Sequence, residues 1–265
     1  MAEPPRPDES PSDPTAQKSP ASMAEQIRRG RMLFIAMAVA YTLGNFYDNF
    51  NKQAVSLLAL SHHRAGLPGP ITILFTIPFL LFYAAAGWLA DRFPRRRVII
   101  ASKALELIFL CLGAVGIMTL NWPLIVIVIF LMAVQATIFG PALSVCIPDV
   151  YPESYVVRAN ARLTSATTAG ILLGVVAAGL VLNLQGTFHG LPLGRLIAAC
   201  SLVGVSVIGL LVSFGVPNRP AGNPKVPFPW LGPVSSLRDL WELRTDGLLT
   251  ASIITYAYFW LIAGL

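Results

Sequence analysis

Four polar side chains share one face of an apolar run that begins at Met32. If the run is an α-helix, they fall within an arc of about 100°, and they are Asn45, Asp48, Asn49 and Lys52. Asp48 stands 16 residues, or about 24 Å, along that helix. An ionisable group so deep in an apolar segment is costly and usually faces a cavity or a partner. Asp48 and Lys52 could simply neutralise each other at i and i+4, but the asparagines beside them favour a face that lines a polar cavity.

A second pair of charges, Lys103 and Glu106, interrupts another apolar run. Lys103 is near one end of that run, so its long side chain can reach the polar surroundings at that end. Glu106 is about one helical turn deeper and cannot do so easily. Two interpretations stay open: Glu106 pairs with Lys103, or it binds protons or cations as the coupling residue of an ion-driven cycle.

A charged loop between two apolar runs begins at Gly87 and reads GWLADRFPRRR. Its spacing closely matches the G-x-x-x-D-R-x-G-R-[RK] signature of the major facilitator superfamily, with a proline in place of the last glycine. A carboxylate at a helix end can accept charge-assisted hydrogen bonds from arginines, and such a latch would hold one conformation and open in another. The candidate gating residues are Gly87, Asp91, Arg92, Arg95 and Arg96. Alternatively, the arginines only set the membrane topology.

Two pairs of residues in later runs bear on helix geometry. Gly140 and Pro141 stand inside an apolar run, where proline removes a backbone donor. We predict a helix break at this pair, facing protein or a water-filled cavity. Gly170 and Gly174 have the i, i+4 spacing of small residues that let two helices approach closely, so we expect them to pack rather than to bind a substrate.

Composition identifies the class of protein that must position these side chains. Of 265 residues, 55% are hydrophobic and only 12% are charged, and the mean hydropathy is +0.67. A soluble domain carries about 25% charged residues, so we predict an integral membrane protein. About 20 apolar residues cross a bilayer as a helix, whereas outer-membrane strands are about 10 residues long and alternate. The chain is therefore predicted to be all-α and transmembrane, with apolar runs at residues 32–60, 71–90, 98–120, 122–143, 166–184, 193–216 and 248–265.

The distribution of basic residues predicts the orientation. If the N-terminus is cytoplasmic, the outer loops hold only Arg64 and Arg195. The basic residues of the inner side are then Arg28, Arg29, Arg31, Arg92, Arg95, Arg96, Arg97, Lys103, Arg158, Arg162, Arg219, Lys225, Arg238 and Arg244. This strong positive-inside bias accounts for the net charge of +6. It leaves no support for a nucleic-acid partner.

Four segments follow from these patterns. Residues 1–26 are rich in proline and lack aromatic residues, so we expect a disordered cytoplasmic tail. Residues 27–216 would form a six-helix transmembrane bundle, and residues 217–247 a proline-rich cytoplasmic central loop. Residues 248–265 would be a truncated seventh helix. Six helices, a long inner loop and the start of another set is the order of a transporter built from two six-helix halves.

Sequence motifs of soluble enzymes are missing. The chain has no phosphate-binding glycine loop, no nucleophile elbow and no metal-ligand spacing among its three cysteines. We therefore expect no catalytic residue, no metal and no cofactor.

Together, the polar face, the charged loop and the glycines at 170 and 174 resemble one branch of the major facilitator superfamily. That branch comprises the bacterial lysophospholipid transporters, including those fused to 2-acylglycerophosphoethanolamine acyltransferase. The matching stretches are FYDNFNKQA at 46–54, PFLLF at 78–82, GWLADR at 87–92, KALE at 103–106, FGP at 139–141, PD at 148–149, ANA at 159–161 and GILLG at 170–174. The chain departs from the branch at Leu143 and Ser144, where its members have lysine and tyrosine.

The resemblance implies the N-terminal half of a secondary transporter in the bacterial inner membrane. Its expected partners are membrane lipids, a lysophospholipid or other small-molecule substrate, and the missing C-terminal half or a partner chain. Asn45, Asp48, Asn49 and Lys52 would line the substrate pathway, with Glu106 as the coupling candidate. Three alternatives stay open: the transporter-like part of an acyltransferase fusion, a drug or metabolite exporter, and a membrane assembly protein that transports nothing.

Overall fold

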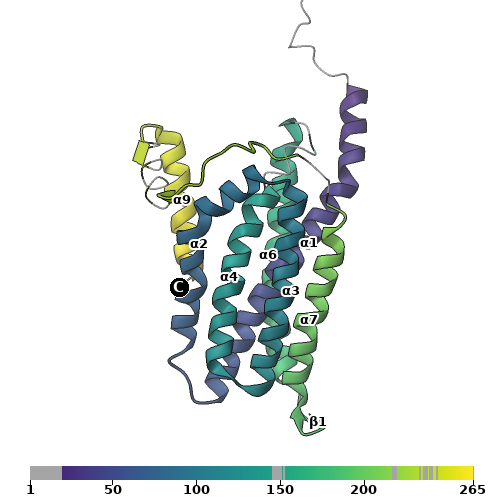
Figure 1. Ribbon diagram of the computed structural model, residues 1–265, viewed down its shortest axis with the longest axis vertical. Coiled ribbons are helices and arrows are strands. Elements are labelled where there is room, and N and C mark those ends of the chain that lie inside the picture. Colours follow the sequence, from purple (N-terminus) through teal and green to yellow (C-terminus); the bar gives the residue numbers. More distant parts are fainter. Residues whose placement is uncertain are drawn as a thin grey trace, which may run out of the picture.

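The computed structural model describes residues 20–144, 151, 153–216, 220–232, 234, 238, 241–242 and 244–264. Within these residues the chain forms seven long helices, most of them aligned side by side (Figure 1). They are α1 (Pro20–Ser61), α2 (Pro68–Arg92), α3 (Arg95–Thr119), α4 (Trp122–Ser144), α6 (Glu153–Leu182), α7 (Leu193–Ser213) and α9 (Gly247–Gly264). A small antiparallel hairpin of β1 (Thr187–Phe188) and β2 (Leu191–Pro192) joins α6 to α7.

Five of these helices are long and apolar enough to cross a membrane, counting only the residues described: α2, α3, α4, α6 and α7. The prediction of an all-α transmembrane fold is confirmed. α1 is not among the five, and its segment from Gly44 to Lys52 holds three asparagines and an aspartate. The arrangement of six bundle helices plus a seventh stays a prediction.

The bundle is organised around α1 and α3. α1 packs along α6 and α7, α2 packs along α4, and α3 lies against both α4 and α7. The predicted close contact at the two glycines of α6 is confirmed. A Cβ atom on Gly170 would lie 2.8 Å from the carbonyl oxygen of Thr42, and one on Gly174 would overlap the carbonyl oxygen of Phe46. Only glycine therefore allows α6 to approach the backbone of α1 so closely.

Two predicted boundaries differ from the structure. α1 begins at Pro20, so the expected end of a disordered tail at residue 26 falls inside a helix; residues 1–19 lie outside the described part. α6 begins at Glu153, 13 residues before the apolar run. Hydropathy locates the part of a helix that lies in lipid, whereas backbone hydrogen bonding continues into the polar residues beyond it.

The predicted helix break at Gly140 and Pro141 does not interrupt α4. α4 continues through both residues to Ser144. A proline inside a helix removes one hydrogen bond, but the neighbouring turns can keep their own, and α2 likewise contains Pro78. Space is open beside Gly140, since a Cβ atom there would meet nothing within 4 Å.

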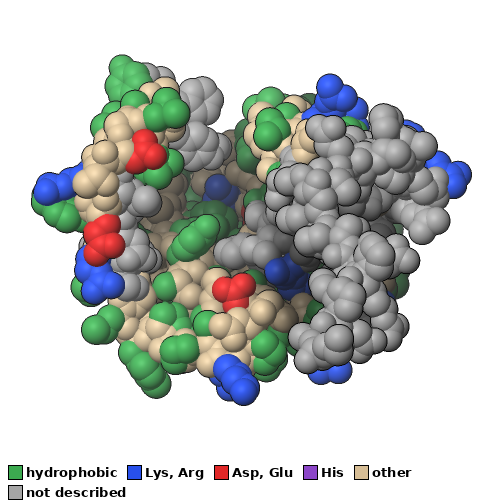
Figure 2. Space-filling view, turned by 90° about the horizontal axis from the view of Figure 1, so that it is seen from above, with side chains coloured by type: hydrophobic (Ala, Val, Ile, Leu, Met, Phe, Trp, Pro, Cys, Tyr) green, Lys and Arg blue, Asp and Glu red, His purple; other side chains and the backbone are tan. Residues whose placement is uncertain are grey.

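The described part of the central loop, residues 220–232, crosses the end of the bundle where α2 and α3 meet (Figure 1). The hairpin lies at the opposite end, and the first turns of α1 rise beyond the other helices. Seen from the central-loop end, lysine and arginine side chains are spread around the rim (Figure 2). These positions are consistent with the predicted inner side, which stays a prediction.

Candidate functional site

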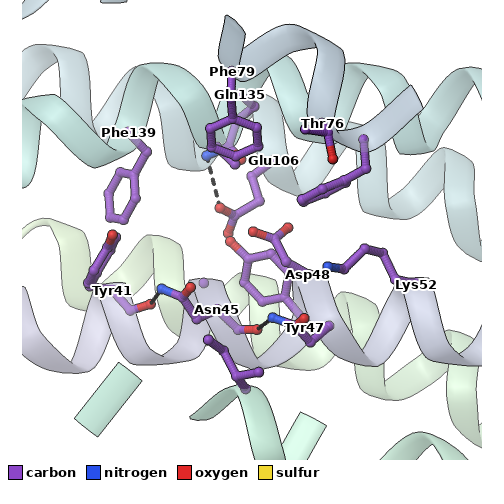
Figure 3. Close-up of a pocket in the computed structure, with 15 residues that line it drawn as sticks. Tyr41, Asn45, Tyr47, Asp48, Lys52, Thr76, Phe79, Glu106, Gln135 and Phe139 are labelled. Atoms are coloured by element: carbon purple, nitrogen blue, oxygen red, sulfur yellow. Dashed lines mark hydrogen bonds between the residues drawn. The ribbon is translucent and has the colours of Figure 1, made fainter. Parts of the chain in front are cut away.

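A cavity of about 780 Å³ opens between α1, α2, α3, α4 and α6. It brings together all four polar residues predicted on α1 and also the coupling candidate Glu106 (Figure 3). The lining residues are Tyr41, Gly44, Asn45, Tyr47, Asp48, Asn49, Lys52, Phe75, Thr76, Phe79, Glu106, Gln135, Ala136, Phe139 and Ile171. The cavity thus combines charged groups on α1 and α3 with aromatic rings on α1, α2 and α4.

Asp48 and Lys52 do not form a direct pair. Among the described residues, no ion pair within 4.0 Å involves either of them, although both lie on the same cavity. The Oδ1 atom of Asp48 is buried and has no hydrogen-bond partner in this part of the chain. The Nζ atom of Lys52 instead lies 4.4 Å from the ring centroid of Phe75, a cation–π contact. A buried carboxylate oxygen without a donor is costly, so this geometry favours the polar-cavity interpretation over mutual neutralisation.

The asparagines of α1 divide between two faces. Asn45 donates to the carbonyl oxygen of Tyr41 at 3.0 Å, and Asn49 donates to that of Asn45 at 2.8 Å. Each of these side chains keeps a carbonyl oxygen that accepts no hydrogen bond from the described residues. Asn51 points elsewhere: it is 3% exposed and contacts the sulfur of Met132 at 3.7 Å. The sequence pattern therefore identified the two asparagines that face the cavity.

Lys103 and Glu106 are joined by an ion pair inside the bundle. The Nζ atom of Lys103 lies 2.9 Å from Oε2 of Glu106 and also donates to the hydroxyl oxygen of Tyr47 at 3.0 Å. Gln135 donates to the same carboxylate oxygen at 3.0 Å and to Ser102 at 2.9 Å. Three helices, α1, α3 and α4, therefore contribute to one hydrogen-bonded network.

The expectation that Lys103 reaches polar surroundings at the helix end is wrong. Its side chain is 0% exposed, and its Nζ atom lies 4.2 Å from the ring centroid of Phe139. Once the Glu106 carboxylate and the Tyr47 hydroxyl are within reach, turning inward satisfies the ammonium group. Glu106 therefore pairs with Lys103, as the first of the two interpretations expects. A coupling role for Glu106 remains a proposal.

Three members of this network, Tyr47, Ser102 and Gln135, are absent from the predicted site. Tyr47 lies inside the matching stretch at 46–54 but was not assigned to the polar face, Ser102 directly precedes Lys103, and Gln135 is a single residue among apolar neighbours. One signal was available, because Gln135 is the only amide or charged side chain of α4. A polar group inside a membrane helix is costly unless it has a partner, so its presence alone indicates a contact with another helix.

The predicted gating residues gather where α2 ends and α3 begins. α2 ends at Arg92 and α3 begins at Arg95. In the described ranges, no ion pair within 4.0 Å joins the Asp91 carboxylate to an arginine. The backbone carbonyl of Asp91 accepts from the amide of Asn223 at 2.9 Å. A Cβ atom on Gly222 would lie 3.7 Å from both Asp91 Oδ1 and an Arg95 terminal nitrogen, so the central loop lies directly against this turn.

The central loop is held by side chains of α2. Val226 offers one carbonyl oxygen that accepts from Trp88 at 3.1 Å and from Arg92 at 3.0 Å. The ring of Phe228 packs edge-on against Trp88, with centroids 5.0 Å apart. On the neighbouring helix end, Arg96 donates to the carbonyl oxygen of Phe214 at 2.9 Å. Here two of the predicted gating arginines bind backbone carbonyls. Gly87, the first residue of the signature, has open space where a Cβ atom would lie.

Comparison with known proteins identifies the family. A family profile described as Major Facilitator Superfamily matches residues 9–265. The chain belongs to the major facilitator superfamily. It is a multi-pass membrane protein. Residues 87–92 of the charged stretch, expected as a loop, are helical, so Asp91 and Arg92 form the end of α2 directly before the turn to α3.

Curated superfamily members similar to the chain are named Lysophospholipid transporter LplT. The chain is 27% identical to the protein of Enterobacter sp. (strain 638) over 248 residues, which cover 90% of the chain and 58% of that relative. It is 28% identical to the protein of Escherichia coli O139:H28 over 228 residues, covering 85% of the chain and 53% of the relative. It is 27% identical to the protein of Cronobacter sakazakii over 197 residues, which cover 74% of the chain and 45% of that relative. The chain thus spans about half the length of the relatives it matches.

Proposed function

We propose that the chain is the N-terminal half of a secondary transporter that moves lysophospholipid or a related amphiphile across the bacterial inner membrane. The observation that carries the proposal is the cavity in which Asp48 and Lys52 lie beside aromatic rings and form no ion pair with any residue that the structure describes. Curated relatives with names of lysophospholipid transporters support the substrate class. The N-terminus would be cytoplasmic, as the basic residues predict.

The cavity suits a solute with one charged end and one apolar end. Lys52 can attract a phosphate, and Asp48 can attract an ammonium group. Because Asp48 and Lys52 are not paired with each other, no ion pair between them has to break when a zwitterionic headgroup binds. The rings of Tyr41, Phe79 and Phe139 provide an apolar wall on the remaining sides. In a two-half transporter the C-terminal half would close the cavity from the other side.

Two further roles belong to the same proposal. Glu106 is the coupling candidate, because a carboxylate already shared between Lys103 and Gln135 can exchange partners when a cation or proton enters. Asp91, Arg92, Arg95 and Arg96 would gate the inner side of the pathway together with the central loop that contacts them.

A flux assay on the full-length transporter tests the proposal. Asp48→Asn removes one charge and keeps the shape of the side chain, and we expect it to reduce uptake of a fluorescent lysophosphatidylethanolamine into proteoliposomes by about tenfold or more, the effect of losing one charge-assisted hydrogen bond. The control is Glu242→Gln, an equivalent change at a carboxylate that is 68% exposed. Wild-type flux in Asp48→Asn, with normal membrane insertion, would remove Asp48 from the mechanism.

Competition in the same assay addresses substrate class. Leu143 and Ser144 replace a lysine and a tyrosine of the lysophospholipid branch, which favours a second candidate, an exporter of a different small amphiphile. Unlabelled lysophospholipid should compete with the fluorescent probe at equimolar concentration. Competition by cationic drugs alone would support the second candidate instead.

A further inference from the structure

A second cavity, which we call the hairpin-end cavity, has a volume of about 670 Å³. It lies between α1, α6 and α7 beside the β1–β2 hairpin, at the end of the bundle opposite the central loop. The two cavities share no lining residue. Lys52 lines the first and its neighbour Gln53 lines the second, so α1 itself separates them. The lining residues are Gln53, Leu57, Leu58, Leu60, Ser61, His62, Gly179, Leu182, Asn183, Leu184, Pro192, Gly194 and Arg195.

The hairpin-end cavity holds hydrogen-bond donors that no described residue uses. The side chains of Gln53, Asn183 and Arg195 make no hydrogen bond or ion pair with any residue that the structure describes. No Asp or Glu lines the cavity. The guanidinium of Arg195 is permanently charged and presents a planar set of donors that matches phosphate geometry. Two amides and one half-buried, unpaired guanidinium form a site suited to an oxyanion.

One side of the same cavity is apolar and faces outward. Leu57 and Leu58 line its wall, and Leu60 and Leu184 at its edge are 52% and 45% exposed. Leucines exposed on the surface of a membrane-spanning bundle are able to contact acyl chains. A soluble anion would leave this surface uncovered, whereas a lipid would place its headgroup on the donors and its chain along the leucines.

We infer that the hairpin-end cavity binds a phosphate-bearing lipid, with the phosphate on Arg195, Gln53 and Asn183 and an acyl chain along Leu60 and Leu184. This site is distinct from the cavity of about 780 Å³ lined by Asp48 and Lys52, which we call the transport cavity after its proposed role, and it does not depend on the proposed function. A free phosphate ester shares the headgroup chemistry, so the experiment must separate the two sources.

Native mass spectrometry of the full-length protein in detergent micelles measures the inferred binding directly. The probes are phosphatidylglycerol, a diacylglycerol of the same chains, which lacks the phosphate, and glycerol 3-phosphate, which lacks the chains. We expect phosphatidylglycerol to bind, and Arg195→Gln to weaken that binding by about tenfold, as expected when a charge-assisted hydrogen bond is lost. The control is Arg64→Gln. Arg64 is the other arginine predicted on this side, and it lies 5.4 Å from the ring centroid of Trp122 without lining the cavity.

A second variant tests the cavity without changing charge. A Cβ atom on Gly179 would meet nothing within 4 Å, so Gly179→Leu places a larger apolar side chain at the cavity wall and should displace the lipid. Gly204→Leu is its control, because Gly204 in α7 is equally open and does not line the cavity.

Three results would overturn the inference. They are wild-type phosphatidylglycerol binding in both Arg195→Gln and Gly179→Leu, equal binding of the diacylglycerol, and glycerol 3-phosphate binding as tightly as the lipid. Asp48→Asn should leave lipid binding at this cavity unchanged, because Asp48 lines only the other one. That variant therefore distinguishes failure of the transport proposal from failure of this one.

Discussion

The Nζ atom of Lys103 and the Oε2 atom of Glu106 lie 2.9 Å apart, with side chains 0% and 1% exposed. Glycines on two other helices make room for this pair. A Cβ atom on Gly44 of α1 would lie 3.1 Å from Lys103 Nζ, and one on Gly209 of α7 would lie 3.8 Å from Glu106 Oε1. The pair therefore sits where α1, α3 and α7 meet, and any shift between these helices changes its surroundings.

Removing one charge of this pair should destabilise the protein more than removing both. Lys103→Met or Glu106→Gln alone leaves an uncompensated charge inside the bundle, at a cost of about 3–5 kcal/mol. In the double variant no charge remains, so we expect it to cost less than either single variant, which corresponds to a coupling free energy above about 3 kcal/mol between the two changes. Thermal unfolding of the four proteins in detergent gives this value. Additive losses would mean that the two side chains do not interact energetically.

Asp91→Asn should slow transport without weakening substrate binding. Asp91 lies at the turn between α2 and α3, and it is not among the residues that line the transport cavity. If it helps to hold one conformation, its loss should lower kcat of flux by about tenfold and leave KM unchanged. Asp48→Asn provides the contrast. Because Asp48 lines the cavity, this substitution should raise KM. An Asp91→Asn protein with normal kcat would place Asp91 outside the gate.

Gly174→Ala should destabilise the bundle, whereas Gly179→Ala should not. A methyl group on Gly174 would overlap the backbone of Phe46, which cannot move without shifting α1. Overpacking of this kind costs about 1–3 kcal/mol. Gly179 lies on the same helix with open space beside it, so it is a matched control. The measurement is the yield and melting temperature of each variant in detergent, and equal melting temperatures would contradict the tight contact.

Trp88→Phe should loosen the central loop while leaving the bundle intact. The indole N–H donates to the carbonyl oxygen of Val226, and phenylalanine keeps the ring but not the donor. One hydrogen bond is worth about 1 kcal/mol, so amide exchange in residues 220–232 should accelerate roughly fivefold. Trp230→Phe is the control, because Trp230 is 86% exposed. Hydrogen exchange that is equal in both variants would show that Trp88 does not hold the loop.

The apolar runs agree closely with the bounds of several helices. The run at residues 98–120 compares with α3 at Arg95–Thr119, and the run at 122–143 with α4 at Trp122–Ser144. Hydropathy fails at the starts of α1 and α6, where polar residues continue the helix outside the apolar region. Burial in lipid and backbone helicity are different properties, and only the first is encoded in hydropathy.

The cavity was predictable on α1 and much less so elsewhere. Asn45, Asp48, Asn49 and Lys52 lie on one helix, so their shared face follows from the period of 3.6 residues. Lys103 was misplaced because its direction depends on Tyr47, 56 positions earlier in the chain. Contacts between helices depend on how the helices pack, and no local spacing encodes that arrangement.

Because α1 is long, a small movement of this helix at the transport cavity produces a larger movement at its first turn. Its 42 residues span about 63 Å, roughly twice the thickness of the hydrocarbon layer. Asp48 and Pro20 are 28 residues, or about 42 Å, apart on this helix. A tilt of about 10° with its pivot at Asp48 would move Pro20 by about 7 Å. α1 is thus a lever arm, and a spin label near its first turn would report helix movements too small to resolve at the cavity itself.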